Sequence, residues 1–147
     1  MGGGGGKGGK SGGSFEATDY RLGIHYAVCV GPVDEIRQIV VSDKSLGIDT
    51  VTSNTAVAID DMDLFGGAKK GGGVKGVIEF LLGSASQILP EHLAAKLGRT
   101  AETVTAYRNI CSVWFRGGGT EGFTWSTNIP SVPPPEVTVR RAPKGLS

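Results

Sequence analysis

The part of the chain that most closely matches a chemical motif is Gly4 to Ser11, which reads GGGKGGKS. This stretch fits the phosphate-binding pattern G-x-x-x-x-G-K-[ST], in which backbone N–H groups and a lysine hold the phosphates of a nucleotide. The chemistry also needs a buried strand leading into the loop and a helix leaving it. No strand-like run precedes the pattern, and Gly12 and Gly13 follow where the helix would start. We therefore attribute the match to the glycine-rich composition of this segment.

A zinc-type site is the second chemistry that the residue types allow, because the chain contains two histidines and two cysteines. His25 and Cys29 lie four positions apart in a predicted strand, which places them on one face but about 13 Å from each other, too far to share a metal ion. His92 is expected at the surface of a short helix. Two cysteines do not make a disulfide framework, so Cys29 and Cys111 are expected to be buried free thiols, as suits a reducing cytoplasm. The sequence predicts no metal site and no cofactor.

Acidic and hydroxyl side chains offer no clearer catalytic centre. Asp60, Asp61 and Asp63 lie close together, but the segment lacks the glycine and the terminal glutamate of an EF-hand calcium loop, so a solvated acidic turn is expected. Ser84 and Ser112 have no adjacent nucleophile motif. We predict that the protein is not an enzyme. The competing hypothesis, an enzyme on a β scaffold, requires an activity that depends on one of the histidines.

Length and charge place the chain among single-domain proteins without a strong electrostatic preference. It has 147 residues and a net charge of +1, so long-range attraction to nucleic acid or to an anionic membrane is weak. No apolar run approaches the roughly 18 residues of a transmembrane helix, and the glycine-rich start lacks the apolar core of a signal peptide. Neither a membrane partner nor export is expected.

The elements that must position any functional residue are mostly strands. The segment Tyr20–Lys44 contains two apolar runs separated by Gly31 and Pro32, a pattern typical of a hairpin. In Val74–Leu82, the even-numbered residues are mostly apolar and fall on one face of a predicted strand. The remaining predicted elements are a short apolar run at Ala56–Ile59, a short helix at Pro90–Gly98, strands at Thr103–Arg116 and Phe123–Ser126, and a last strand containing Val137 and Val139 after the extended prolines 133–135. The predicted fold class is mainly β (α+β), an antiparallel domain of six or seven strands with one short helix.

The chain divides into three parts. Residues 1–14 form a flexible arm rich in Gly, Lys and Ser, residues 15–141 a β-rich domain, and residues 142–147 a C-terminal extension or the start of a linker. Glycine-rich segments can become ordered on assembly, which applies to the arm and to the loop at residues 66–73. The candidate assembly contacts are Gly4, Lys7, Lys10, Gly67, Lys69, Lys70 and Gly72.

The lysines of these two segments also support a different hypothesis, a small nucleotide- or nucleic-acid-binding module that uses the lysine–glycine arm. No aromatic residue is interleaved among them, so the stacking platforms that bind single strands are missing. No sequence-specific nucleic-acid partner is expected.

The order of four segments resembles the N-terminal region of the tail hub, or tail-tip attachment, proteins of long-tailed bacteriophages and gene transfer agents. The segments are YAVCVGPVDEIRQIVVSDK, VKGVIEFLLGSASQILPEHLAAKLG, AYRNICSVWFRG and NIPSVPPPEVTVRR. They include a Gly-Pro turn at Gly31 and Pro32, and together they extend from about Tyr20 to Arg141. The sequence departs from the family at Asn109, where glycine is common, and in the insertion-like PSVPPP.

The resemblance implies a structural role in the virion. Such hub proteins form a ring, usually trimeric, beneath the distal tail protein, hold the tip of the tape-measure protein, and connect to the receptor-binding fibre. A member of this family is assembled in the cytoplasm of the host bacterium and resides at the tail tip. The expected partners are therefore further copies of the chain, the distal tail protein, the tape-measure protein, and other tail-tip or fibre proteins.

Overall fold

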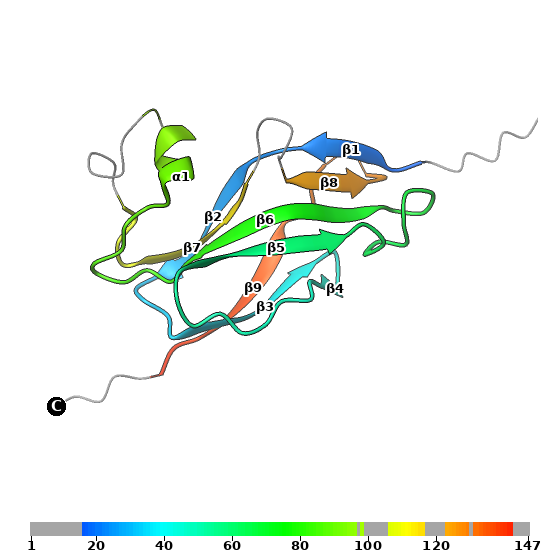
Figure 1. Cartoon of the computed structure of the whole chain (residues 1–147). Coiled ribbons are helices and arrows are strands. Elements are labelled where there is room, and N and C mark those ends of the chain that lie inside the picture. The colour runs from blue at the N-terminus through cyan, green and yellow to red at the C-terminus, as the bar shows by residue number, and fades with distance from the viewer. Residues whose placement is uncertain (1–15, 97, 99–105, 117–122, 130, 143–147) are drawn as a thin grey trace, which may run out of the picture.

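The computed structural model describes residues 16–96, 98, 106–116, 123–129 and 131–142. These residues form antiparallel strands and one short helix, which confirms the predicted fold class (Figure 1). The elements are β1 (Thr18–Arg21), β2 (Ile24–Val30), β3 (Glu35–Val41), β4 (Lys44–Ser45), β5 (Thr55–Asp61), β6 (Gly73–Leu81), α1 (Glu91–Lys96), β7 (Ile110–Phe115), β8 (Thr124–Thr127) and β9 (Pro135–Arg140).

The larger of the two sheets is built around β6. One side of β6 pairs with all of β5, and the other side pairs with β7 near one end and with β8 near the other. Strand β2 pairs with β7, and β1 pairs with β8. Strands β1 and β2 therefore follow each other along one line, and β7 and β8 follow each other along the neighbouring line. One row across the sheet consists of Val57, Ile78, Phe115 and Ile24. The edges of this sheet are β5 on one side and the β1–β2 line on the other.

The smaller sheet contains β3, β4 and β9, and its pairing corrects one prediction. Both strands expected in Tyr20–Lys44 are present, but they do not form a hairpin, because β2 pairs with β7 whereas β3 pairs with β4 and β9. The chain leaves one sheet for the other at Gly31 and Pro32. Gly31 has a φ of 85°, which glycine adopts without a steric penalty. A Gly-Pro break therefore marked a turn correctly, but it did not determine the partner of either strand.

The two sheets pack face to face, and the main hydrophobic core lies between them. Phe115 is at the centre of an aromatic group, with its ring centroid 4.9 Å from that of Phe123, 5.1 Å from that of Trp125 and 5.6 Å from that of Tyr26. Pairs of this kind contribute about 0.5–1.5 kcal/mol each beyond the area that they bury. Other fully buried members of the core are Ile36, Ile39, Val41, Ile78, Phe80 and Val113.

The opposite face of the large sheet is covered by the segment that contains α1. Leu81 and Trp114 form a second buried cluster there with Leu89 and Leu93. Figure 1 shows α1 lying at the end of the sheet where β2 and β7 meet. Strand β6 is consequently buried on both faces at residues 78–81, whereas Lys75 on its outer face is exposed.

Gln87 joins this outer layer to the rest of the protein. Its Oε1 accepts hydrogen bonds from the backbone N–H of Gly83 (2.9 Å) and from Nδ2 of Asn54 (3.2 Å). Its Nε2 donates to the carbonyl oxygens of Ala106 (2.9 Å) and Tyr107 (3.2 Å). The residue is 2% exposed, so these bonds replace nearly all the water that the amide would otherwise bind.

The sequence-based prediction is confirmed in detail for β6 and α1. Val74, Ile78 and Phe80 face the main core, as the alternation of Val74–Leu82 indicated, and the predicted short helix is present as α1. The last strand is also present, as β9.

The strand predicted at Thr103–Arg116 is shorter than expected. Residues 99–105 lie outside the described residues, and β7 begins only at Ile110. Tyr107 and Asn109 adopt φ values of 49° and 62°, a left-handed conformation that cannot continue a strand. Asparagine tolerates this conformation better than most residues. Asn109 therefore fits a position where the tail hub proteins, which the sequence resembles, commonly have glycine.

Replacement of Gln87 by leucine should destabilise the protein by about 2–4 kcal/mol, because the N–H of Gly83 and the carbonyls of Ala106 and Tyr107 lose a buried partner. Urea denaturation followed by circular dichroism measures this loss. The matched control is Gln38→Leu on the exposed side of β3, where Nε2 bonds only to Oγ of Ser45, and there we expect a change below about 1 kcal/mol. Equal losses in the two variants would contradict the role given to Gln87.

Candidate assembly surface

The loop between β5 and β6 contains four of the predicted assembly contacts, and it is folded rather than open. The N–H of Phe65 donates to the carbonyl of Gly72 (2.8 Å), and the N–H of Gly72 donates back to the carbonyl of Gly67 (2.6 Å). The N–H of Lys70 also donates to the carbonyl of Gly67 (3.0 Å). These bonds close the loop on itself, so that Lys69 and Lys70 project from its tip as exposed residues.

Gly67 and Gly72 are buried, and Gly72 shows why this loop requires glycine. It has a φ of 85°, and a Cβ atom at this position would overlap the carbonyl oxygen of Ser126 in β8. The absence of a side chain therefore allows the loop to lie directly against the neighbouring strand. Of the four predicted contacts in this loop, only Lys69 and Lys70 present side chains to a partner.

The loop is fastened to the segment where the N-terminal arm joins the domain. The N–H of Ala17 donates to the carbonyl of Ala68 (2.8 Å), and Nδ2 of Asn128 donates to the carbonyl of Lys70 (2.9 Å). Figure 1 shows the β5–β6 loop at the same end of the molecule as the start of β1. The structure thus places the β5–β6 loop next to Ala17, the third residue after the predicted arm. The arm contacts themselves lie outside the described residues; they are Gly4, Lys7 and Lys10.

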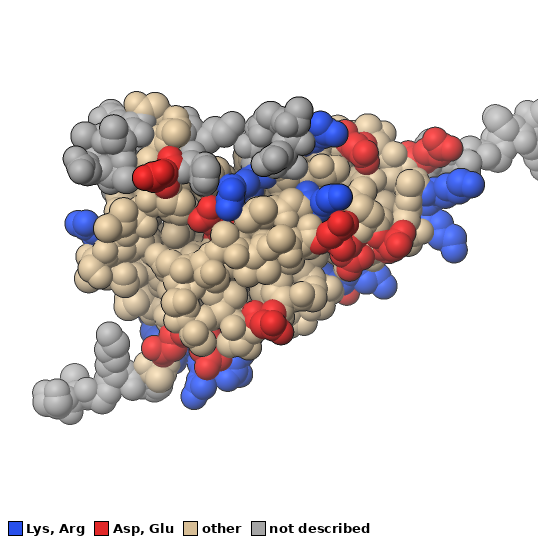
Figure 2. Space-filling view, viewed as in Figure 1, with Lys and Arg blue, Asp and Glu red and all other residues tan. Residues whose placement is uncertain are grey.

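The charges around this loop have both signs. Asp60 at the end of β5 forms an exposed ion pair with Lys75 of β6, with 3.4 Å between the two atoms. Asp63 precedes Lys69 and Lys70 in the same loop and is exposed. Figure 2 shows acidic and basic side chains interspersed at this end of the molecule. Such a mixture opposes the continuous positive potential that a phosphate backbone requires.

Strand β5 presents the second feature suited to assembly, an open edge. It pairs with β6 on one side, and no strand among the described residues pairs with its other side. Thr55, Ala56 and Ala58 are exposed on it, and the preceding residues 50–54 contribute no charge. Figure 2 shows a broad surface without charged side chains over this part of the molecule. Depletion of charge is typical of the central part of a protein–protein interface.

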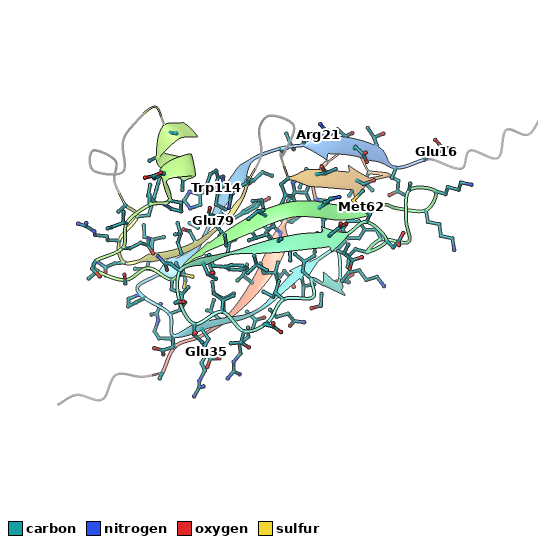
Figure 3. The ribbon with its side chains drawn as sticks, in the orientation of Figure 1. Glu16, Arg21, Glu35, Met62, Glu79 and Trp114 are labelled. Carbon is teal, nitrogen blue, oxygen red and sulfur yellow. The ribbon has the colours of Figure 1, made fainter. Side chains whose placement is uncertain are left out.

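The outer face of the large sheet carries the titratable residues that could have formed a catalytic centre. Glu79, Trp114 and His25 are neighbours in one row across β6, β7 and β2. Glu79 lies 2.9 Å from Nε of Arg116, but that N–H is not aimed at the carboxylate, so the contact is an ion pair without a good hydrogen bond. Figure 3 shows Glu79 and Trp114 on this side of the sheet. His25 and Glu79 are two strands apart, about 10 Å, with Trp114 between them, so they cannot share a proton.

The expected common face of His25 and Cys29 is wrong, because β2 contains a β-bulge between Ala27 and Cys29. His25 lies on the outer face, where its ring meets that of Tyr107 edge to face at 5.0 Å, whereas Cys29 packs against the main core. The bulge inserts one residue and reverses the alternation beyond it. Among the described residues, no group of three or more His, Cys, Asp or Glu side chains could hold a metal ion.

Shallow hollows occur between the described residues, and two of them contain no nucleophile–base pair. One, of about 290 Å³, lies at the crossing between the sheets and is lined by Pro32, Val33, Thr52, Ser53, Asn54, Leu82 and Ser84. The other, of about 180 Å³, is lined by Val40, Ser42, Asp43, Pro133, Pro134 and Glu136.

No protein-family profile matches the sequence, and no curated protein is significantly similar to it. In the part of the chain that the structure describes, no helix is long and apolar enough to cross a membrane. The role suggested by the four resembling segments therefore stays a proposal.

The sequence does not predict the open edge at β5; it predicts only a short apolar run at Ala56–Ile59. The signal was available in part, because Thr55–Asp61 alternates between apolar inward and polar or small outward residues. Its position at the edge was not available, since that depends on which strands pair elsewhere in the chain.

Replacement of Gly72 by alanine should destabilise the protein by about 2–4 kcal/mol, because the new Cβ would overlap β8 and the φ is unfavourable. Gly47→Ala is the matched control. A Cβ atom at Gly47 meets nothing within 4 Å, so this variant should change the free energy of unfolding by no more than about 1 kcal/mol, toward greater stability. Thermal and urea unfolding measure both variants, and a neutral Gly72→Ala would show that the loop does not pack as described.

The stability of the protein should fall in mild acid because of His25. Burial lowers the pKa of His25 below its ordinary value of 6.5, so the unfolded chain takes up a proton at a higher pH than the native state does. The contribution of neutral His25 to the free energy of unfolding is fully present above pH 6.5. It is lost as the pH falls from 6.5 through the pKa of His25 in the native protein. His25→Phe, which keeps a ring against Tyr107, should remove this contribution, while His92→Gln should retain it. Urea midpoints between about pH 8 and pH 5.5 test this, and parallel curves for wild type and His25→Phe would count against it.

Proposed function

We propose that this chain is a structural subunit of a bacteriophage tail tip. In this role it forms a homo-oligomeric ring, a trimer, that connects the distal tail protein and the tape-measure protein to the receptor-binding tip. It is assembled in the cytoplasm of the host bacterium and ends in the virion. The kind of assembly comes from the ordered resemblance of the four sequence segments, and the physical means comes from the open edge of β5.

The unpaired edge of β5 is the observation that most strongly supports assembly. A seven-residue strand that has no partner on one side among the described residues presents a row of N–H and C=O groups that another chain can pair with. Proteins that remain monomeric usually protect such an edge with a proline, an inward-pointing charge or a bulge. Residues 55–59 of β5, TAVAI, include none of these protections, and the charges of the strand are confined to Asp60 and Asp61 at its end.

The opposite edge of the same sheet is protected. Strand β2 is disrupted by its bulge near Cys29, and the long β1–β2 line is interrupted at Leu22 and Gly23. The sheet therefore has one edge suited to pairing and one that is not. In a cyclic trimer each interface is head-to-tail, so β5 would pair with a different surface of the neighbouring subunit rather than with another β5.

A second feature suits a ring subunit: Ala17, which follows the predicted arm, is bonded to the β5–β6 loop. Since Ala17 is bonded to Ala68, an arm that becomes ordered on assembly would start next to Lys69 and Lys70. An arm and a loop at one end could then contact the same neighbour. The competing nucleic-acid-binding module would use these same lysines, and experiments can separate the two roles.

The purified full-length protein should form a defined oligomer at micromolar concentration, and Ala56→Lys combined with Ala58→Lys should weaken its association about tenfold or more. Lysines on an edge strand disfavour pairing with another chain, which is how natural proteins protect such edges. Sedimentation velocity or native mass spectrometry measures the oligomer. The control, Thr50→Lys, adds a charge to the same uncharged surface outside the strand.

Two results would contradict the proposal. One is a wild-type protein that stays monomeric at all concentrations and does not co-purify with tail particles. The other is salt-sensitive binding to a polynucleotide that is lost in a Lys69→Ala, Lys70→Ala variant while the oligomer is unaffected. The second result would favour the nucleic-acid-binding module.

A further inference from the structure

The two cysteines of the chain face each other across neighbouring strands. Cys29 in β2 and Cys111 in β7 are direct partners in the antiparallel register, and both are free thiols. Residues paired in this way have Cα atoms about 4.5–5.5 Å apart, and a disulfide bond requires a Cα separation of roughly 4.4–6.8 Å. The backbone therefore already holds the two cysteines at a distance that a disulfide can bridge.

The bulge in β2 is what brings the two sulfur atoms to the same face. With His25 on the outer face, simple alternation would place Cys29 on the outer face too, away from Cys111. The extra residue between Ala27 and Cys29 turns Cys29 inward, where it packs against the same core as Cys111. A bulge that re-aims a side chain in this manner is a common device at functional positions.

The two thiols differ in their accessibility. Cys111 is fully buried, and this burial, together with the adjacent Cys29 sulfur, raises the pKa of Cys111 to about 12. Cys29 is only partly buried, and Nη2 of Arg141 lies 3.8 Å from its Sγ. A dissolved oxidant can therefore reach Cys29 but not Cys111, and Cys111 is positioned to react only with Cys29.

We propose that Cys29 and Cys111 form a redox modification site, which closes to an intramolecular cross-strand disulfide when the folded protein meets a low-molecular-weight disulfide oxidant. The Cys29 thiolate attacks one sulfur of the oxidant RSSR, so that a bond from Cys29 to SR forms and RS⁻ leaves. The Cys111 thiolate then attacks Sγ of Cys29, which forms the Cys29–Cys111 bond and expels the second RS⁻. The two protein thiols lose two electrons to the oxidant, and their protons end on the two released RSH molecules.

The bond would fasten the edge strand β2 to β7 immediately before the chain crosses between sheets at Gly31 and Pro32. It would close a loop of about 80 residues, and cross-links that close long loops restrict the unfolded chain most. The two cysteines would then strengthen the crossing in an oxidising medium and leave it unconstrained in a reducing one. This inference does not depend on the proposed tail-tip role, since it concerns the isolated chain.

The experiment treats the folded, full-length protein with oxidised glutathione, then alkylates the remaining free thiols and measures the intact mass. We expect both thiols to disappear without a retained glutathione and without linkage between protein molecules, because the second step is intramolecular. The reaction should become faster as the pH is raised from about 7 to 9, since Cys111 must lose its proton before it attacks Cys29. The melting temperature should rise by roughly 5–15 °C and return to its starting value after reduction.

Two alanine variants separate the roles of the cysteines. Cys111→Ala should accumulate a stable glutathione adduct on Cys29, whereas Cys29→Ala should remain unmodified because Cys111 is buried. Retention of two alkylatable thiols in the oxidised wild type would overturn the proposal. A persistent glutathione adduct on the wild type, or disulfide-linked dimers in place of the internal bond, would overturn it as well.

Discussion

The structure depends on one constraint, that residues 78–81 of β6 must be covered on both of their faces. Ile78 and Phe80 point to one side of the sheet, and Leu81 and the ionisable Glu79 point to the other. The first side is covered by the small sheet. The second is covered by the segment around α1, which is too short to be stable alone and is held by the buried amide of Gln87.

The sequence predicted the local properties of the strands better than their partners. The alternation in Val74–Leu82 identified the inner face of β6, because side-chain direction in a strand is set by the backbone alone. The hairpin at Tyr20–Lys44 was wrong, since pairing depends on contacts with β7 and β9, which lie far along the chain. The bulge beyond Ala27 was equally invisible, and it reversed the expected orientation of Cys29.

At the candidate assembly surface, too, the sequence predicted local properties but not contacts between distant segments. Glycine and lysine composition identified the loop at residues 66–73, and the structure confirms that Lys69 and Lys70 are exposed there. Composition could not show that Gly72 is needed for close packing against Ser126, because that contact joins residues more than fifty positions apart. The open edge of β5 is likewise a property of the completed sheet. The sequence of these seven residues does not show which side of the strand lacks a partner among the described residues, because that depends on how the other strands pair.

The connection between β7 and β8 is a position where insertions can be tolerated during evolution. The N–H of Phe123 donates to the carbonyl of Arg116, so the two ends of the intervening residues 117–122 are tied together, and Arg116 is itself bonded to Val77 of β6. Insertions whose ends are already closed add little chain entropy, because the cost of a loop grows only slowly with its length. New sequence can therefore be acquired at this point without shifting the register of either flanking strand. At this position the chain can be lengthened, in evolution or by insertion of a reporter peptide, while the packing of the two sheets is preserved.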